Sequence, residues 1–509
     1  MTDGATTSTP EEARLAASDV VAAWCLRNAE RQLRLRNTEH AGLMAYVAAA
    51  TAAELGQSTL CSPALESLLL RIGSTIDAVA APHDRRRGRW LHVFTMTTTI
   101  GGHTALARRW IGRNPGHRVH DVVLTGQAVE AADPGLLRVA RASGGSVQSV
   151  STAGTLLGRA RTLRALAAGA DAVVLHAHMW DVLPALAFAR PGGPPVLLMN
   201  HADHAFWVGS AVADAVIDFR DSGAALTQRL RAPRGVRRLP VALDERGALP
   251  PDRKALAGRL PARALDSGIL VLTIGRASKY QSHRALDFPA TARRIVQALD
   301  DCTLVAVGPP SNDPLWQSLA RDTDGRAVAV GEDVNLAPWH AAADLYLEGF
   351  PVGSYTALLE TVQAGRGVVR KPWLAPPDVL PVDAGALAAT APPRDPDAYV
   401  ADALRLARDP SARDAQVGAL RPAVVAMHTG AGWDAALRNL EDTLPSRHEV
   451  GLAGAPGPMP PALRAYVAAV HAGRVTTSAV AFAESVAATQ RVALRRDVEL
   501  TDALRALPR

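Results

Sequence analysis

Residues 344–371 read DLYLEGFPVGSYTALLETVQAGRGVVRK. Two short apolar runs, 344–349 and 367–371, enclose a segment whose apolar residues recur at helical spacing. A strand, a helix and a second strand in this order are typical of an open parallel sheet with helical connections. The stretch therefore predicts one βαβ unit of an α/β protein.

The same alternation extends through the middle of the chain. Because 509 residues exceed what one core supports, we expect two doubly wound, Rossmann-like domains in series, joined by a Pro-, Gly- and Arg-rich connection at 244–267. Helical periodicity precedes and follows them. The predicted strands are 91–96, 120–126, 172–177, 195–200 and 215–219, then 269–275, 302–308, 327–331, 344–349 and 367–371. The predicted regions are a helical N-terminal region (1–85), a first domain (90–243), a second domain (268–392) and C-terminal helices with a tail (393–509).

Composition excludes several classes of protein. No run of about 18 uncharged apolar residues occurs, and the first residues lack the pattern of a signal peptide, so we expect a cytoplasmic protein without a membrane span. The net charge is +6, but basic and acidic residues alternate, which favours a phosphorylated small molecule over nucleic acid as the ligand. Cys25, Cys61 and Cys302 lack the spacing of metal ligands or a disulfide framework.

Unusual polar residues follow the predicted strands, where ligands of open parallel sheets bind. In the first domain these segments are 97–103, 176–181 and 200–204, and in the second domain they are 275–279, 331–335 and 348–356. We expect the two edges to face each other across a cleft.

The second domain carries a candidate phosphate site. Arg276 and Lys279 directly follow a strand, and both can bind one oxyanion. The turn at 353–356 leads into a helix, whose free N–H groups and dipole favour a phosphate. Glu360 lies one turn further on and could accept hydrogen bonds from ribose hydroxyls. Surface charge and an ordinary helix cap are the alternatives.

This order of motifs resembles the nucleotide-sugar domain of the GT-B glycosyltransferases, and the resemblance extends over about residues 90–440. It implies that the protein transfers a sugar from a nucleotide-diphosphate sugar, most simply a UDP-sugar, which serves as a co-substrate. It also implies that the reaction needs no cofactor and no bound metal. Arg276 and Lys279 would bind the diphosphate, the 353–356 turn the distal phosphate, Glu360 the ribose and residues 330–335 the base. The implied donor-binding residues are Gly101, Gly102, Arg276, Lys279, Glu332, Glu348, Gly353, Ser354, Tyr355, Thr356 and Glu360.

One spacing departs from that family. The separation of Glu348 and Glu360 differs from that of the two glutamates typical of retaining enzymes. The FPVGSYTALLE segment is instead similar to the phosphate-binding turn of inverting enzymes such as the O-linked N-acetylglucosamine transferases. Both stereochemical courses therefore stay open.

The first domain offers candidate catalytic groups. Gly101, Gly102 and His103 resemble a glycine-rich loop of GT-B enzymes, and His103 at a helix N-terminus should have a lowered pKa and stay neutral. In the segment NHADH, His201 or His204 could deprotonate the acceptor, while Asp203 fixes the ring's tautomer. A capping residue and histidines bonded to backbone are the structural alternatives.

A metal site competes with this interpretation of the histidines. His176, His178 and His201, with Asp203 and His204 nearby, could supply three ligands, as in metal-dependent hydrolases. Against this, such hydrolases usually use a single barrel. We therefore predict a metal-independent glycosyltransferase that acts on an unidentified small molecule, glycan or protein. A metal-dependent hydrolase using His176, His178 and His201 and a non-catalytic nucleotide-sugar binding protein are the alternatives.

Overall fold

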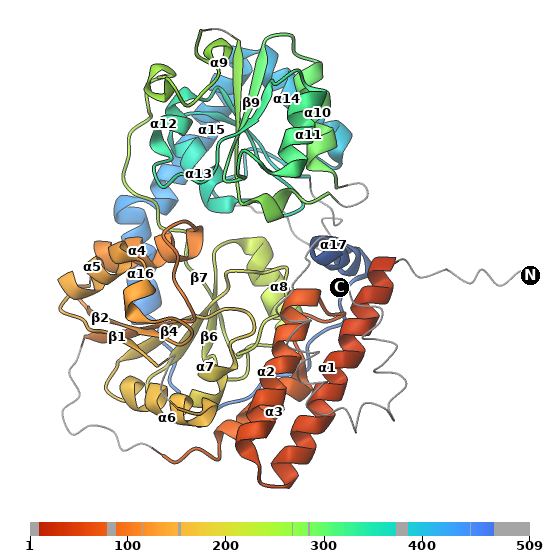
Figure 1. Ribbon diagram of the computed structural model, residues 1–509. Helices are drawn as coiled ribbons and strands as arrows, with labels where there is room; N and C mark the ends of the chain where they lie inside the picture. The colour runs from red at the N-terminus through yellow and green to blue at the C-terminus, as the bar shows by residue number, and fades with distance from the viewer. Residues whose placement is uncertain are drawn as a thin grey trace, which may run out of the picture. The chain divides into compact units, whose positions relative to one another are not determined.

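The computed structural model describes residues 10–78, 88–114, 116–150, 154–266, 268–282, 286–372, 385–447 and 449–472 (Figure 1). The chain forms two compact units. Unit 1 comprises Met1–Leu239 and Leu437–Arg509, and unit 2 comprises Pro240–Ala436. Most of the predicted tail, residues 473–509, lies outside the described residues.

Unit 1 contains a parallel sheet whose seven strands, counted over the described residues, follow the order β3-β2-β1-β4-β5-β6-β7. The order reverses between β1 and β4, which are paired with Phe94 opposite His176. This is the topological switch point, where ligands of such sheets bind. The strands are β1 (Arg89–Phe94), β2 (Val119–Leu124), β3 (Val147–Ser149), β4 (Ala172–His176), β5 (Val196–Met199), β6 (Ala215–Asp218) and β7 (Val236–Arg238).

Helices cover this sheet and extend from it. Buried apolar side chains of the N-terminal helices join the sheet residues in one hydrophobic core, including Trp24, Leu69 and Val173. Proline or a polar residue begins most helices, as at Ser62, whose hydroxyl accepts from the Leu65 N–H. The helices of unit 1 are α1 (Pro10–Arg34), α2 (Thr38–Leu55), α3 (Pro63–Gly73), α4 (Gly102–Arg113), α5 (Pro134–Ala142), α6 (Leu156–Ala167), α7 (Val182–Ala187), α8 (Asp221–Arg231) and α17 (Pro461–Ala472).

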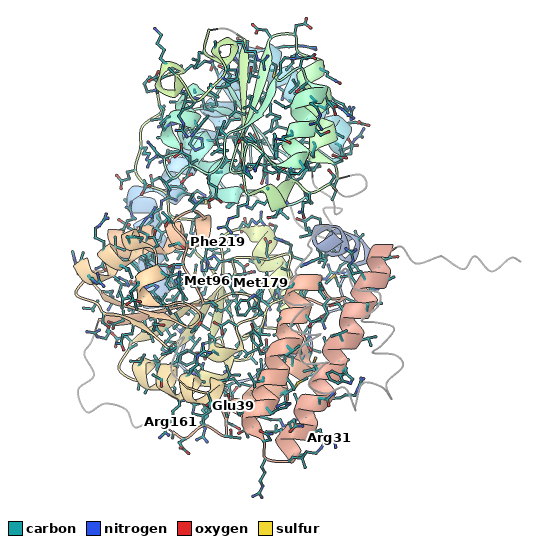
Figure 2. The ribbon with its side chains drawn as sticks, in the orientation of Figure 1. Arg31, Glu39, Met96, Arg161, Met179 and Phe219 are labelled. Carbon is teal, nitrogen blue, oxygen red and sulfur yellow. The ribbon has the colours of Figure 1, made fainter. Side chains whose placement is uncertain are left out.

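Two carboxylates anchor the N-terminal helices to the rest of unit 1. Glu66 of α3 is buried and accepts hydrogen bonds from the backbone N–H groups of Gly209, Ser210 and Ala211. Glu39 of α2, labelled in Figure 2, accepts from the first N–H groups of α6. Helix α17 packs against α1 and α2, beside which it is drawn in Figure 1. The helical N-terminal region is thus a fixed part of unit 1.

Unit 2 repeats the same topology with five parallel strands among the residues that the structure describes, in the order β10-β9-β8-β11-β12. Its switch point lies between β8 and β11. The strands are β8 (Ile269–Ile274), β9 (Cys302–Val307), β10 (Ala327–Ala329), β11 (Leu345–Leu347) and β12 (Gly367–Val369). The helices are α9 (Ala262–Asp266), α10 (Phe288–Gln297), α11 (Pro314–Asp322), α12 (Ala337–Ala342), α13 (Tyr355–Gln363), α14 (Pro396–Arg408) and α15 (Pro410–His428), with α16 (Gly430–Asp442) following.

The predicted α/β class with two doubly wound sheets is confirmed. All ten predicted strands are present, and β3 and β7 are additional. In the described ranges no helix combines the length and the hydrophobicity needed to cross a membrane.

Candidate functional site

The switch point of unit 2 brings a lysine to the beginning of a helix. A short 3-10 helix, η3 (Ala277–Tyr280), follows β8 and carries Lys279. The Lys279 Nζ atom donates to the Gly353 carbonyl oxygen and to Ser354 Oγ, each at 3.1 Å. Ser354 is the residue that precedes α13. A positive charge is therefore held beside the N-terminus of α13.

The electrostatics around Lys279 favour an anion. The pKa of Lys279 is lowered to about 8, mainly by burial; the Glu348 carboxylate opposes this shift, and the charges of Arg276 and Lys371 add to it. Glu348 is itself buried and accepts a hydrogen bond from the Lys371 backbone N–H at 2.9 Å. Three cationic side chains and one carboxylate thus share this switch point, and a bound anion would relieve their mutual repulsion.

The turn at 353–356 lies so close to Glu348 and to Gly275 that only small residues fit at the contacts. A Cβ atom on Gly353 would lie 2.2 Å from Glu348 Oε1, and one on Gly275 would lie 3.1 Å from Ser354 Oγ. Ser354 makes no side-chain cap bond to α13 within the described chain, because its hydroxyl faces Lys279. The backbone at 353–356 can therefore come close to a ligand, and the helix dipole adds to the positive potential there.

The predicted donor residues of unit 2 occupy different parts of this edge. Lys279, Glu348, Gly353 and Ser354 are brought together, and Arg276 is close enough to affect the charge of Lys279. Tyr355 and Thr356 form the first turn of α13. Glu360 lies further along α13, where its Oε2 is 4.0 Å from Nε2 of buried His340. Glu332 is exposed in the segment after β10.

The switch point of unit 1 gathers three histidines from separate elements. His103 lies in the first turn of α4, His176 is the last residue of β4, and His201 follows β5. One ring nitrogen from each lies within 4.8 Å of the others. Figure 2 labels Met96, Met179 and Phe219 along this edge of the sheet, and the Phe219 ring centroid is 5.5 Å from that of His201.

This cluster differs from the histidine set that the sequence offered as an alternative metal site. His103 takes the place that the sequence assigned to His178, whose ring centroid is 6.3 Å from that of His103. Gly101, directly before α4, has φ of 141°, a conformation that favours glycine and that turns the chain into the helix. The glycine-rich loop thus positions His103 over the end of β4.

A chain of hydrogen-bonded side chains supports His176. His176 Nε2 lies 3.1 Å from His92 Nδ1, His92 Nε2 lies 2.9 Å from His120 Nδ1, and His120 Nε2 lies 3.1 Å from Asn114 Oδ1. The Phe94 ring stacks on His176 with centroids 4.4 Å apart. The ring of His176 is therefore fixed on both its edge and its face.

Burial keeps these rings neutral. It lowers the pKa of His103 to about 3, an effect that nearby His178 reinforces and that a hydrogen bond to the His176 backbone opposes. The pKa values of His176 and His201 are also well below the ordinary range, because of burial first and neighbouring histidines second. The sequence predicted a lowered pKa for His103, but its main cause is burial, not the helix N-terminus.

His204 lies outside the three-histidine cluster and pairs with Asp203. The His204 Nδ1 atom is 3.2 Å from Asp203 Oδ1, and Arg220 Nε donates to Asp203 Oδ2 at 3.0 Å. Burial alone would raise the pKa of Asp203, but Arg220 and His204 hold it below its ordinary value. The His204 ring also meets Tyr466 of α17 edge-on, with centroids 5.9 Å apart. Of the two histidines that the sequence offered as partners of Asp203, the structure thus pairs it with His204.

Known structures share this architecture. A mutant O-GlcNAc transferase of Thermobaculum terrenum superposes with a TM-score of 0.52 and 16% identity, covering 89% of this chain and 84% of that chain. HepE of Anabaena in complex with UDP and glucose gives a TM-score of 0.53 and 14% identity, covering 70% of this chain and 99% of that chain. The chain has the GT-B glycosyltransferase fold. No model of a known family matches the sequence, and no curated protein matches it either.

Several residues of this GT-B protein were missed in the sequence. His92 and His120 are polar residues inside buried strands, and that interruption of the apolar pattern was the signal that could have indicated them. Arg220 follows β6, so the rule that placed His201 after β5 would also have placed it at this edge. Tyr466 has no signal of this kind, because its contact with His204 depends on where α17 packs.

Proposed function

We propose that this chain is a glycosyltransferase that uses a nucleotide-diphosphate sugar, with uridine as the nucleoside. The observation that carries the proposal is Lys279, which is held at the N-terminus of α13 with Arg276 and Lys371 nearby. The GT-B fold and the UDP in the Anabaena HepE structure support the choice of donor.

The geometry of unit 2 suits the departure of a diphosphate. In the transfer, a bond forms between the acceptor oxygen and the anomeric carbon of the sugar, and the bond from that carbon to the diphosphate breaks. Lys279 and the N–H groups at the start of α13 would stabilise the charge that develops on the diphosphate. Gly353 would let the backbone approach the phosphate, as its close contact with Glu348 leaves no room for a side chain.

Further donor contacts are part of the proposal. Glu360 would bind the ribose hydroxyls, and the 330–335 segment, with Glu332, would lie against the base. Arg276 would reach the diphosphate from the exposed side of η3.

Unit 1 would supply the groups that act on the acceptor. The acceptor hydroxyl must lose a proton, and His204 is the proposed base, with its tautomer fixed by Asp203. His103 and His201, with Gly101 and Gly102, would line the acceptor side. The acceptor is a small molecule, a glycan or a protein with a free hydroxyl.

Calorimetric titration of the purified chain with UDP, and with GDP for comparison, tests the donor site. We expect micromolar binding of UDP that is the same with and without EDTA, because Lys279 and the α13 N-terminus need no metal to hold a phosphate. Absence of binding to both nucleotides, or binding that EDTA abolishes, would contradict the proposed donor site.

A turnover assay separates the enzyme from a non-catalytic binding protein. UDP-glucose and UDP-N-acetylglucosamine are incubated with the chain and a panel of sugar, glycan and peptide hydroxyl acceptors, and released UDP is measured. Release that requires both the chain and an acceptor supports transfer, whereas release without an acceptor is hydrolysis of the donor. Tight UDP binding without release from either donor would favour the binding protein.

A further inference from the structure

We propose that His103, His176 and His201 form a binding site for one divalent transition-metal ion, with Zn²⁺ as the best-fitting ion. The site lies wholly within unit 1, at the switch point between β1 and β4. It does not depend on the proposed donor site, which lies in unit 2.

The first observation is that three neighbouring histidines each carry a ring nitrogen without a partner in the described structure. The atoms His103 Nε2, His176 Nδ1 and His201 Nε2 are each buried and have no hydrogen-bond partner among the described residues. Ring nitrogens of these same residues lie within 4.8 Å of one another. A buried polar atom without a partner costs about 1–3 kcal/mol, so three in neighbouring rings require an explanation.

The second observation is that the tautomer of His176 is fixed by its neighbours. Asn114 Nδ2 donates to the Arg118 carbonyl, and Asn114 Oδ1 accepts from the Arg118 N–H, so the amide orientation is determined. Asn114 Oδ1 must therefore accept from His120 Nε2. His120 Nδ1 then accepts from His92 Nε2. In the same way, His92 Nδ1 accepts from His176 Nε2. This order leaves a lone pair on His176 Nδ1.

His103 is oriented in a comparable way. Its ring is hydrogen-bonded to the backbone of His176, while Nε2 is the atom left without a partner in the described structure. Metal-bound histidines usually use one ring nitrogen for the metal and donate with the other to a carbonyl or a side chain. Two of the three histidines thus already have the supporting contacts of metal ligands.

A divalent cation is the occupant that suits these rings. His103 and His176 each donate with one ring nitrogen, so the nitrogen without a partner carries a lone pair in each. A cation between the rings would accept these lone pairs and the one that His201 can offer. Neutral imidazole binds a metal without first losing a proton at neutral pH.

The ligand chemistry selects the ion. Three imidazole nitrogens without a carboxylate suit Zn²⁺, Co²⁺, Ni²⁺ or Cu²⁺, whereas Mg²⁺ and Ca²⁺ prefer oxygen. Zn–N distances are about 2.0–2.1 Å, so the nitrogens must approach one another by small rotations of the half-buried His103 and His201 rings. Three histidines leave a fourth tetrahedral position for water or another oxygen ligand.

The test measures metal binding to the full chain after removal of metal with a chelator. Zn²⁺ is titrated in competition with a chromophoric chelator, and Co²⁺ binding is followed by its visible absorption, which reports tetrahedral nitrogen ligation. We expect one ion per chain and a rise in melting temperature with added Zn²⁺. No Zn²⁺ or Co²⁺ binding above that of the competitor would overturn the proposal.

Two matched variants identify the ligands. His201→Ala removes a ligand from a loop, and we expect Zn²⁺ affinity to fall by roughly 100-fold or more, since loss of a supporting contact alone costs 10–100-fold. His178→Ala removes a neighbouring histidine that is not in the proposed set, and Zn²⁺ affinity should fall far less than in His201→Ala. Unchanged binding in His201→Ala, or lost binding in folded His178→Ala, would overturn the assignment.

Folding of the variants is checked by circular dichroism. If His201→Ala does not fold, His103→Gln replaces it, because a glutamine keeps much of the ring's volume and occupies the half-buried start of α4. UDP titration in EDTA is run in parallel, so that failure of the metal site is distinguished from failure of the donor site.

Discussion

The Nζ atom of Lys279 lies 3.1 Å from the Oγ atom of Ser354, 75 positions later in the chain. This contact joins the end of β8 to the beginning of α13. It places an ammonium group beside the positive end of a helix dipole, an arrangement that a nearby negative charge stabilises. Buried Glu348 supplies one such charge, and we propose that the diphosphate of the donor supplies another.

Replacing Lys279 with alanine should weaken UDP binding by about 1.5–3 kcal/mol, the range for a hydrogen bond to a charged group. Calorimetric titration measures the change. Lys254→Ala is the matched control, because Lys254 is exposed on η2 (Lys254–Leu256), and its loss should leave UDP affinity unchanged. Equal UDP affinity for Lys279→Ala and the unmodified chain would refute the role of Lys279.

UDP affinity should fall as the pH rises from 7 to 9. Burial lowers the pKa of Lys279 to about 8, so the free protein loses this charge well before an ordinary lysine does. Above that pKa the protein must take up a proton to bind the anion, and affinity should decline by up to about tenfold per pH unit. Lys279→Arg keeps its charge throughout this range. A flat profile in the unmodified chain, or the same decline in Lys279→Arg, would show that another group is responsible.

Gly353→Ala should impair the donor site through sterics. Its Cβ atom would lie 2.2 Å from Glu348 Oε1 and 3.1 Å from Lys371 Cδ, so the turn before α13 must shift. We expect UDP affinity to fall at least about tenfold, that is, by about 1.4 kcal/mol. Gly418→Ala is the control, because a Cβ there meets open space within α15 and should raise stability by about 0.5–1 kcal/mol. Normal UDP binding by Gly353→Ala would mean that the turn does not contact the ligand.

Glu66→Ala should destabilise unit 1. The change leaves the backbone N–H groups of Gly209, Ser210 and Ala211 without their acceptor, so we expect a loss of about 2–4 kcal/mol in the free energy of unfolding. Urea denaturation followed by tryptophan fluorescence measures it. Glu130→Ala on exposed η1 (Val129–Ala131) should stay within about 0.5 kcal/mol. Similar midpoints for the two variants would contradict the anchoring role of Glu66.

The sequence predicted the strands well because buried parallel strands are continuous apolar runs. It missed β3 and β7, which have three residues each and are partly exposed, so their pattern is too short to recognise. The rule that ligands bind at the carboxyl ends of strands also placed Lys279, His176 and His201 at the correct edges. A strand, and a polar residue that follows it, are both defined by a short stretch of sequence, so the pattern of that stretch is enough to predict them.

Contacts between residues far apart in the chain depend on the order of the strands in the sheet, and the sequence pattern does not predict that order. His103 joins His176 because β1 and β4 are neighbours, although β2 and β3 lie between them in the chain. The attachment of Glu66 to residues 209–211 and the contact of Tyr466 with His204 are equally long-range. Hydrophobic periodicity gives the type of each element but not its neighbours, so these contacts came only from the structure.

His204→Ala should lower sugar transfer while UDP affinity stays constant. In the proposed mechanism His204 donates from Nδ1 to Asp203, which Arg220 holds, and takes the acceptor proton at Nε2. Loss of a general base reduces turnover by about 10²–10⁴-fold. UDP release at saturating donor measures turnover, and calorimetry measures affinity.

The control for His204 is His117→Asn, at an exposed turn with φ of 49°, a conformation that asparagine tolerates. Its turnover should match that of the unmodified chain. If His204→Ala instead unfolds or loses UDP binding, then the contact of His204 with Tyr466 is its main role, and the ring serves to hold α17 in place. Restoration of turnover in His204→Ala by added imidazole would separate the two roles, because free imidazole can accept a proton but cannot replace a packing contact.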